Sequence, residues 1–248
     1  MGKTVIVIPA RYASQRFPGK VLYPLMGKPV LQWVWEAAVK SRCAQRVIIA
    51  SEHKAVAEFA AKIGAEFKMT SASLKSGSDR VWKAAENINC DYVVNLQSDE
   101  PFISSNTLKK TIKFIENNKW ADISTACAEI KNIKEIKDPN CVKIAMASNG
   151  RAFYFSREPI PHHHPLSPEY KIYPYYKHCG LYVYRKKSLA AFVKAKPTHL
   201  ETLERLEQLR ALEMGLKIGV CIVPSLGPAI DTPADVKRAL SYYKKLRG

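Results

Sequence analysis

The sequence predicts an α/β fold, with a mostly parallel sheet and helices on both of its faces. The run Val5-Ile6-Val7-Ile8 is typical of a strand that is buried on both sides. Up to about residue 120, such runs alternate with stretches of helical periodicity, as right-handed βαβ units require. Beyond that point, two strand patterns flank Asn149-Gly150 and predict an antiparallel hairpin with a type I′ turn.

The first half of the chain supplies the alternating elements. Apolar and β-branched runs predict strands at residues 5–8, 47–50, 66–69 and 91–97. Helical spacing predicts helices over residues 30–41 and 53–63, and Gly64 is suited to end the second of them. Capping residues predict two further helices, one from Ser76 to about Asn87 and one over residues 104–117.

The second half has more strand patterns than helices. Strands are predicted at residues 121–127, 142–146, 152–155, 176–184 and 218–223. Helices are predicted over residues 200–214, closed by Gly215, and from about Asp231 onwards. We therefore expect one continuous domain over residues 1–248, whose organisation changes from alternating to antiparallel elements near residue 120.

Composition limits the class of protein. The chain has 248 residues, of which 47% are hydrophobic, and this is enough for a sizeable core. We expect no membrane-spanning segment, because no apolar run reaches 18 residues. The six cysteines form no C-x-x-C pair and most lie in apolar runs, so we expect reduced core residues in the cytoplasm and no zinc site.

The formal net charge of +17 leaves three interpretations open. A lysine-rich solvated surface is the simplest, a site for anionic substrates is the second, and a nucleic-acid-binding module is the third. The lysines are scattered and no nucleic-acid motif is present. Charge alone does not choose between the first two interpretations.

A basic loop follows the first strand. It carries Arg11, Arg16 and Lys20 around a Pro18-Gly19 turn, and it leads into a helix. Polyphosphates bind at this position in α/β proteins, beyond the carboxyl end of a buried strand. The loop matches neither G-x-x-x-x-G-K-[ST] nor G-x-G-x-x-G. A surface loop with scattered charge therefore remains an alternative.

Two acidic positions are candidates for a metal site. Asp99 and Glu100 come at the end of the strand at residues 91–97, where a buried carboxylate needs a partner. A divalent cation is a natural partner if phosphates bind nearby, and a helix N-cap is the alternative. Asp231 likewise precedes Thr232-Pro233, which is also a helix-capping pattern.

The loop at residues 9–20 resembles the P-A-R-x-x-S-x-R-x-P-G-K signature of CMP-Kdo synthetases, where Kdo is 3-deoxy-manno-octulosonate. Further motifs of the family follow in its order, and Ser98 replaces a family glycine in one of them. These motifs are Ser76-Gly-Ser-Asp-Arg80, Leu96-Gln-Ser-Asp-Glu-Pro101, Phe155-Ser-Arg157, His178-Cys-Gly-Leu-Tyr-Val-Tyr184, Glu207-Gln208 and Ile230-Asp-Thr-Pro-Ala-Asp235. The resemblance implies the Rossmann-like fold of the nucleotide-diphospho-sugar transferase superfamily, with an antiparallel part for sugar binding and dimerisation. It also implies that residues 1–120 form the nucleotide-binding half and residues 121–248 the sugar-binding half.

The resemblance also implies the site residues. Catalysis would involve Arg11, Lys20, Asp99 and Asp231, of which Asp99 and Asp231 would bind Mg²⁺. The nucleotide would be bound by Ala10, Arg11, Arg16, Lys20, Ser76, Gly77 and Ser78. The sugar acid would be bound by Arg80, Gln97, Arg157, His178, Tyr182, Glu207 and Gln208.

The implied reaction is transfer of CMP from CTP to the anomeric hydroxyl of Kdo, with release of pyrophosphate, for lipopolysaccharide biosynthesis. The family implies a homodimer and no nucleic-acid partner. Two related activities remain as alternatives, transfer to 8-amino-Kdo or sialic acid and transfer of a uridylyl or guanylyl group to a sugar phosphate. His162, His163 and His164 are adjacent between prolines, which favours an exposed loop over a metal site.

Overall fold

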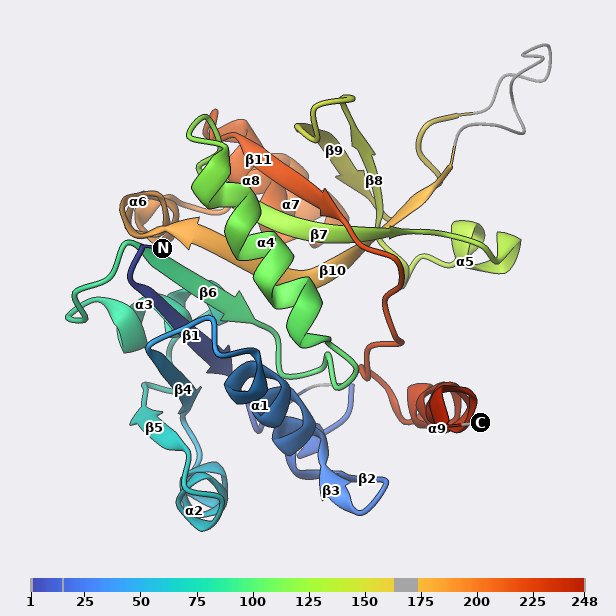
Figure 1. Cartoon of the computed structure of the whole chain (residues 1–248). Coiled ribbons are helices and arrows are strands. Elements are labelled where there is room, and N and C mark those ends of the chain that lie inside the picture. The colour runs from blue at the N-terminus through green and yellow to red at the C-terminus, as the bar shows by residue number, and fades with distance from the viewer. Residues whose placement is uncertain (1, 15, 163–173, 248) are drawn as a thin grey trace.

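In the computed structural model, which describes residues 2–14, 16–162 and 174–247, the molecule is built around one twisted sheet (Figure 1). Strands follow one another across this sheet in the order β11-β7-β10-β6-β1-β4-β5. All of them run parallel except β10, Tyr176–Arg185, which is antiparallel to β6 and to β7. The predicted α/β fold with a mostly parallel sheet is confirmed.

The parallel strands are short and largely buried. From one edge of the sheet to the other they are β5 (Glu66–Met69), β4 (Arg46–Ser51), β1 (Thr4–Pro9), β6 (Tyr92–Leu96), β7 (Ile123–Glu129) and β11 (Ile218–Ile222). Strand β1 lies in the interior of the sheet, and its alternate residues enter two different cores. Ile6 and Ile8 pack on one face of the sheet, while Val5 and Val7 pack on the other.

Helices cover both faces, as βαβ connections require. The first face carries α1 (Val30–Ser41), α2 (Lys54–Lys62) and α4 (Ser105–Asn117). The second face carries α3 (Gly77–Ala85), α6 (Lys186–Lys194), α7 (His199–Glu204) and α8 (Glu207–Glu213). Within the described residues, no helix combines the length and apolar character needed to cross a membrane.

Strands from both predicted halves pair in this single sheet, because β10 lies between β6 and β7. The division at residue 120 therefore stays a prediction about function. Strands β8 (Lys143–Met146) and β9 (Ala152–Ser156) form the predicted hairpin, which adds to β10. The short helix α5 (Ile133–Lys137) precedes that hairpin.

The predicted type I′ turn in that hairpin is wrong. A type I′ turn needs positive φ at both central residues, yet only Gly150 has one, with φ +81°. The Gly150 N–H donates to the Ala147 carbonyl, and the Asn149 side chain accepts from the Arg151 N–H. The longer loop places its single left-handed residue at glycine, where no Cβ opposes it.

The single helix predicted over residues 200–214 is also wrong. Helix α7 ends at Glu204, and Arg205 takes left-handed φ and ψ of 54° and 48° before α8 begins. Leu203, on the last turn of α7, is 66% exposed. No local signal marks the break, because Arg205 is neither glycine nor proline and has no special preference for this conformation.

The last helix packs on a small satellite core. Helix α9 (Pro233–Arg247) follows an extended segment from β11, and Ala239 packs with Leu25, Val30 and Ile230. Near it lie the turn helix η1 (Lys20–Leu22) and the small ribbon of β2 (Pro24–Leu25) and β3 (Lys28–Pro29). The chain therefore brings Asp231, just before α9, back to the loop that follows β1.

Candidate active site

Two hollows adjoin at the carboxyl end of β6. The first has a volume of about 760 Å³ and lies between the loop after β1 and the start of α3. The second has a volume of about 1020 Å³ and is lined by β10, α8, α9 and the segment around α5. Asp99 and Asp231 line both hollows. The two acidic positions therefore lie where the hollows meet.

The basic loop forms one wall of the first hollow. Arg11, Arg16 and Lys20 all line it, as the sequence predicts for a phosphate site. Gly19 has φ +70°, which allows the tight turn, and its N–H donates to the Tyr12 carbonyl at 3.0 Å. Seven of the described residues that line this hollow are Lys or Arg and four are Asp or Glu. An anion is the favoured occupant.

Lys20 joins the two carboxylates. Its Nζ lies 3.0 Å from Asp99 Oδ2 and 3.2 Å from Asp231 Oδ1, and it also donates to the Ile230 carbonyl. Burial lowers the pKa of Lys20, but the two carboxylates outweigh burial and raise it overall. The ammonium group is therefore charged. Arg16 makes a further ion pair with Asp231.

This arrangement fits Mg²⁺ together with phosphates. Mg²⁺ is usually bound in proteins through one or two carboxylates, with phosphate and water oxygens completing its shell. Asp99 and Asp231 supply two carboxylates that already share one cation. Within the described ranges no three His, Cys, Asp or Glu side chains form a metal cage. The donor set thus suits a metal that arrives with a phosphorylated substrate.

The predicted nucleotide-binding residues do not all line the first hollow. Ser76 and Gly77 line the first hollow at the start of α3, where the Ser76 side chain accepts from the Asp79 N–H. Ser78 instead lines the second hollow. Ala10 is fully buried, donates its N–H to the Ala50 carbonyl and lines neither hollow.

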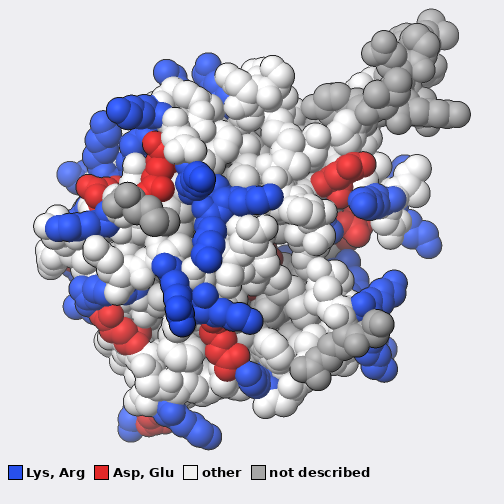
Figure 2. All heavy atoms as spheres, viewed as in Figure 1, with Lys and Arg blue, Asp and Glu red and all other residues white. Residues whose placement is uncertain are grey.

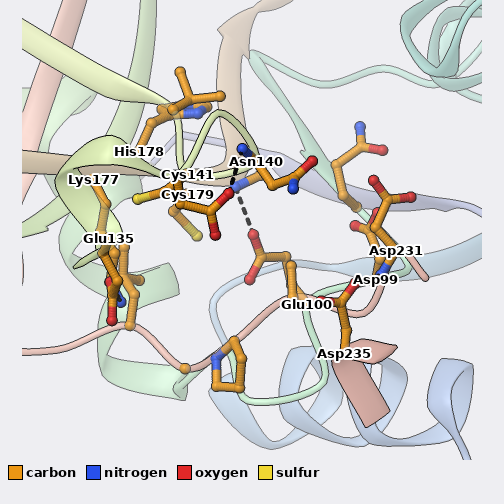
Figure 3. Close-up of a pocket in the computed structure, with 18 of the residues that line it drawn as sticks. Asp99, Glu100, Glu135, Asn140, Cys141, Lys177, His178, Cys179, Asp231 and Asp235 are labelled. Atoms are coloured by element: carbon orange, nitrogen blue, oxygen red, sulfur yellow. Dashed lines mark hydrogen bonds and ion pairs between the residues drawn. The ribbon is translucent and has the colours of Figure 1, made fainter. Parts of the chain in front are cut away.

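Most predicted sugar-binding residues line the second hollow, and Figure 3 labels one of them, His178. They are Gln97, Arg157, His178, Tyr182, Glu207 and Gln208. Arg80 lines only the first hollow, where it pairs with Glu52 at 3.0 Å and donates to Thr70. Its side chain is 3% exposed, so its first role is to neutralise a buried carboxylate.

Burial sets the charge of the second hollow. His178 Nε2 lies 2.9 Å from Thr125 Oγ1, and burial lowers the pKa of His178 to about 3, so the ring is neutral. Burial also raises the pKa of the Tyr182 phenol and of Glu207, although the Ser78 hydroxyl donates to Glu207 at 2.8 Å. His178, Tyr182 and Glu207 therefore present hydrogen-bonding groups without adding positive charge to this hollow.

Arg157 supplies positive charge at the edge of this hollow. Its guanidinium donates to the Glu204 and Pro139 carbonyl oxygens, each at 2.8 Å. Its backbone N–H donates to the Glu204 carboxylate at 3.0 Å. These contacts fix the side chain to the backbone without neutralising its guanidinium.

Two sequence features are clarified by the structure. Ser98 is 6% exposed, and its φ is not positive, so the serine is not strained in place of glycine. His162 is exposed, while His163 and His164 lie outside the described residues.

The sequence indicated Glu100 as a candidate acid but gave it no role in the site, and it missed several other residues. Glu100 lines the second hollow, and Arg205 lines both. Lys237 and Arg238 of α9 also reach the second hollow. The α9 residues carry no local signal, since only tertiary packing places them there.

The surface charge agrees with a solvated, basic exterior. Figure 2 shows Lys and Arg side chains spread over one face, with fewer Asp and Glu between them. No nucleic-acid-binding element is needed to account for that pattern. The hollows at the end of the sheet, rather than the exterior, collect the chemically distinctive residues.

A doubly covered α/β sheet with a basic loop and paired carboxylates beyond its strands defines a nucleotidyltransferase. Comparisons with known proteins agree, since the cytidylyltransferase family model matches residues 5–218. The chain belongs to this family and, within it, to the 3-deoxy-manno-octulosonate cytidylyltransferases, or CMP-Kdo synthetases.

Three relatives illustrate the match. The 3-deoxy-manno-octulosonate cytidylyltransferase of Elusimicrobium minutum (strain Pei191) is 46% identical over 98% of this chain and 99% of its own. A solved CMP:2-keto-3-deoxy-manno-octonic acid synthetase, complexed with CTP, has a TM-score of 0.89 and 34% identity over 98% of this chain and 99% of its own. An 8-amino-3,8-dideoxy-manno-octulosonate cytidylyltransferase of Shewanella halifaxensis (strain HAW-EB4) is 39% identical over 94% of this chain and 95% of its own.

Proposed function

We propose that this protein transfers CMP from CTP to the anomeric hydroxyl of Kdo and releases pyrophosphate, with Mg²⁺ held by Asp99 and Asp231. The observation that supports this proposal most directly is the position of these two carboxylates. They lie where a basic hollow meets a hollow lined with hydrogen-bonding groups. The names of the relatives support this reaction, because one acts on 3-deoxy-manno-octulosonate and another is complexed with CTP.

The first hollow would hold the nucleotide. Arg11, Arg16 and Lys20 present cations to the phosphates and would stabilise the leaving pyrophosphate. The start of α3, with Ser76 and Gly77, adds N–H groups that suit a phosphate or a base edge. The α-phosphorus would then lie near the junction of the two hollows.

The second hollow would hold the sugar acid. Arg157 suits the sugar's carboxylate, because a guanidinium matches a carboxylate with two parallel hydrogen bonds. The neutral ring of His178, with Tyr182 and Gln208, offers donors and acceptors to the hydroxyl groups. The Ser78 hydroxyl of α3 donates a hydrogen bond to the Glu207 carboxylate and so links the wall of this hollow to α3.

The chain orients both substrates for an in-line displacement. Mg²⁺, when bound, supplies positive charge that neutralises the phosphate oxygens. Asp99 follows the end of β6 and Asp231 precedes α9, so two separate elements of the fold position the two carboxylates. The ammonium group of Lys20 between them supports the view that this pair attracts a cation.

Pyrophosphate release from CTP, Kdo and Mg²⁺ tests the proposal. We expect release to need all three components and to fall at least about 100-fold in Asp99→Asn. Glu58→Gln, at an exposed position of α2, is the matched control for losing one carboxylate and should keep full activity. Release in wild type that does not depend on Mg²⁺ would overturn the metal assignment.

Turnover assays with a panel of sugar acids and nucleotides distinguish Kdo and CTP from the alternative acceptors and nucleotides. The Shewanella halifaxensis relative, named for the 8-amino sugar, makes that acid the first competitor. Turnover of 8-amino-Kdo or sialic acid in place of Kdo would keep the reaction and change the acceptor. Turnover of UTP or GTP in place of CTP would change the nucleotide. No turnover with any pair would overturn the proposal.

We also propose a cytoplasmic homodimer that serves lipopolysaccharide biosynthesis. All six cysteines are free thiols, which supports a reducing compartment. Phe153 of β9 and Ile222 of β11 are 63% and 52% exposed, and the Arg151–Gly219 bridge brings their strands together. Light scattering of wild type and Phe153→Glu tests the dimer, which should dissociate in the variant if this surface is buried.

A further inference from the structure

Strand β10 is irregular where it passes the second hollow. His178 pairs with Cys127 of β7, and Tyr182 pairs with Thr125, so four steps along β10 correspond to two along β7. Because this excess is even, His178 and Tyr182 remain on one side of the strand, and both line the second hollow. The residues between them lose their regular partners on β7.

On its other side, toward β6, this part of β10 is held by Glu100. The Gly180 N–H, at the middle of the irregularity, donates to Glu100 Oε1 at 2.8 Å. In return the Gln97 N–H donates to the Gly180 carbonyl at 3.0 Å. The segment after β6 is therefore joined to both backbone polar groups of Gly180.

The approach at Gly180 is close enough to favour glycine. A Cβ built there would lie 3.0 Å from Glu100 Oε1 and 3.2 Å from Gln97 Cβ. Such distances are shorter than those of ordinary packing, so a side chain at this position would displace the Glu100 carboxylate or Gln97 by a few tenths of an ångström. Gly180 thus brings β10 against the segment that carries Asp99.

The side chain of Glu100 points in a different direction from that of Asp99, the residue before it (Figure 3). Figure 3 shows that the Glu100 side chain points toward Cys179 and that Asp99 and Asp231 lie to its other side. Lys20 pairs with Asp99 and Asp231, whereas Glu100 accepts from the backbone of β10. Two adjacent acids therefore serve two different parts of the site.

We propose that Glu100 is a positioning residue for the sugar acid. By accepting the Gly180 N–H, Glu100 fixes the irregular part of β10, and this sets His178 and Tyr182 relative to Asp99. The inference rests on the proposed function, because it assumes that the second hollow holds the acceptor. It adds a role for a residue that contacts neither the metal nor the reacting atoms.

Steady-state kinetics of Glu100→Met and Glu100→Gln test this role. Methionine fills the same space without an acceptor, so we expect KM for the sugar acid to rise about 10-fold. KM for CTP and the Mg²⁺ concentration dependence should stay within about twofold of wild type, since Arg11, Lys20 and Asp99 are untouched. Glutamine keeps an oxygen that can accept the N–H, so it should restore KM to within about threefold.

Two further variants keep the test decisive. Gly180→Ala should raise the same KM, because its Cβ displaces the carboxylate of an intact Glu100 or Gln97 beside it. It replaces Glu100→Met if that variant does not fold. Glu58→Met, on the exposed face of α2, is the matched control and should leave all constants unchanged.

Opposite results would overturn the inference. Equal losses of kcat in Glu100→Gln and Glu100→Met, with a shifted Mg²⁺ dependence, would show a metal ligand or a reacting group. An unchanged KM in Glu100→Met and Gly180→Ala would show that the contact does not position the sugar.

A wild-type protein without turnover of any sugar acid would refute the proposed function instead. Hydrogen exchange of the Gly180 amide would then still show whether this amide donates a hydrogen bond to Glu100. Protection in wild type and in Glu100→Gln, with loss of protection in Glu100→Met, is the expected result. Equal exchange in all three proteins would refute the role of Glu100.

Discussion

Acidification should destabilise the protein through His178. The ring is neutral in the folded protein because burial lowers its pKa from 6.5 to about 3. Between these values the unfolded chain binds a proton that the native state does not, so stability falls as the pH falls below 6.5. At pH 5 the loss is about 2 kcal/mol, from 1.5 pH units at about 1.36 kcal/mol each. Part of the ring faces the open hollow, so solvent screening makes this an upper value.

Urea unfolding of wild type and of His178→Phe at pH 7, 6 and 5 measures the contribution of His178 to the loss of stability at low pH. The variant keeps an aromatic ring beside Phe155 and Tyr182, and Thr125 can still donate to the Leu181 carbonyl. Wild type should lose about 2 kcal/mol more than the variant on going to pH 5.

The comparison with the variant also removes the opposing effect of Glu100. Burial and Asp99 raise the pKa of Glu100 from 4.5 to about 7, so its contribution to stability increases as the pH falls through that range. His199→Phe, at an exposed position, is the matched control for losing a histidine. Parallel stability curves for wild type and His178→Phe, within about 0.5 kcal/mol, would refute the reasoning.

Two further predictions concern stability. Arg80→Met should cost about 3–5 kcal/mol in urea unfolding, because it leaves the Glu52 carboxylate buried without its cation, and Glu52→Gln in the same chain should restore part of the loss. Additive losses in that pair of variants would contradict this. Gly150→Ala should be less stable than Gly64→Ala by about 1 kcal/mol, since both need positive φ but only at Gly150 would the Cβ meet the Val220 carbonyl, at 2.9 Å. Equal midpoints for the two alanine variants would show that the contact relaxes freely.

The sequence sufficed for elements whose stability is local. Residues 30–41 form α1 with the predicted bounds, because Val30, Leu31 and Val34 recur at helical spacing and no residue interrupts them. The capping pattern at Ser76 likewise marks the start of α3 correctly. Local chemistry and tertiary packing agree at these places, so a pattern read along the chain finds the element.

The sequence failed where tertiary packing decides the backbone. The helix predicted over residues 200–214 breaks at Arg205, whose carbonyl accepts from the Arg157 guanidinium. An arginine in left-handed conformation has an intrinsic cost, so only surrounding contacts can hold it there. No periodicity encodes contacts between residues 48 positions apart.

For Asp231, the sequence left two roles open, and the structure shows how they divide between two residues. Helix α9 begins at Pro233, and Asp235 accepts the N–H groups of Asp231 and Thr232. The carboxylate of Asp231 is therefore released from capping and pairs with Lys20. The local pattern Asp-Thr-Pro could not show this, because either acid satisfies the same helix start.

Lys20 explains how Asp99 and Asp231 can lie together in the folded chain before any substrate arrives. Two like charges at one point repel each other, and the ammonium group between them offsets that repulsion. Lys20 also belongs to the loop that the sequence predicts to grip the CTP phosphates, so the same cation lies within reach of both the carboxylates and the first hollow. Because its side chain is 10% exposed and held by three acceptors, it is fixed rather than mobile. The site is thus arranged by the fold, and the substrates would meet charges that need little rearrangement.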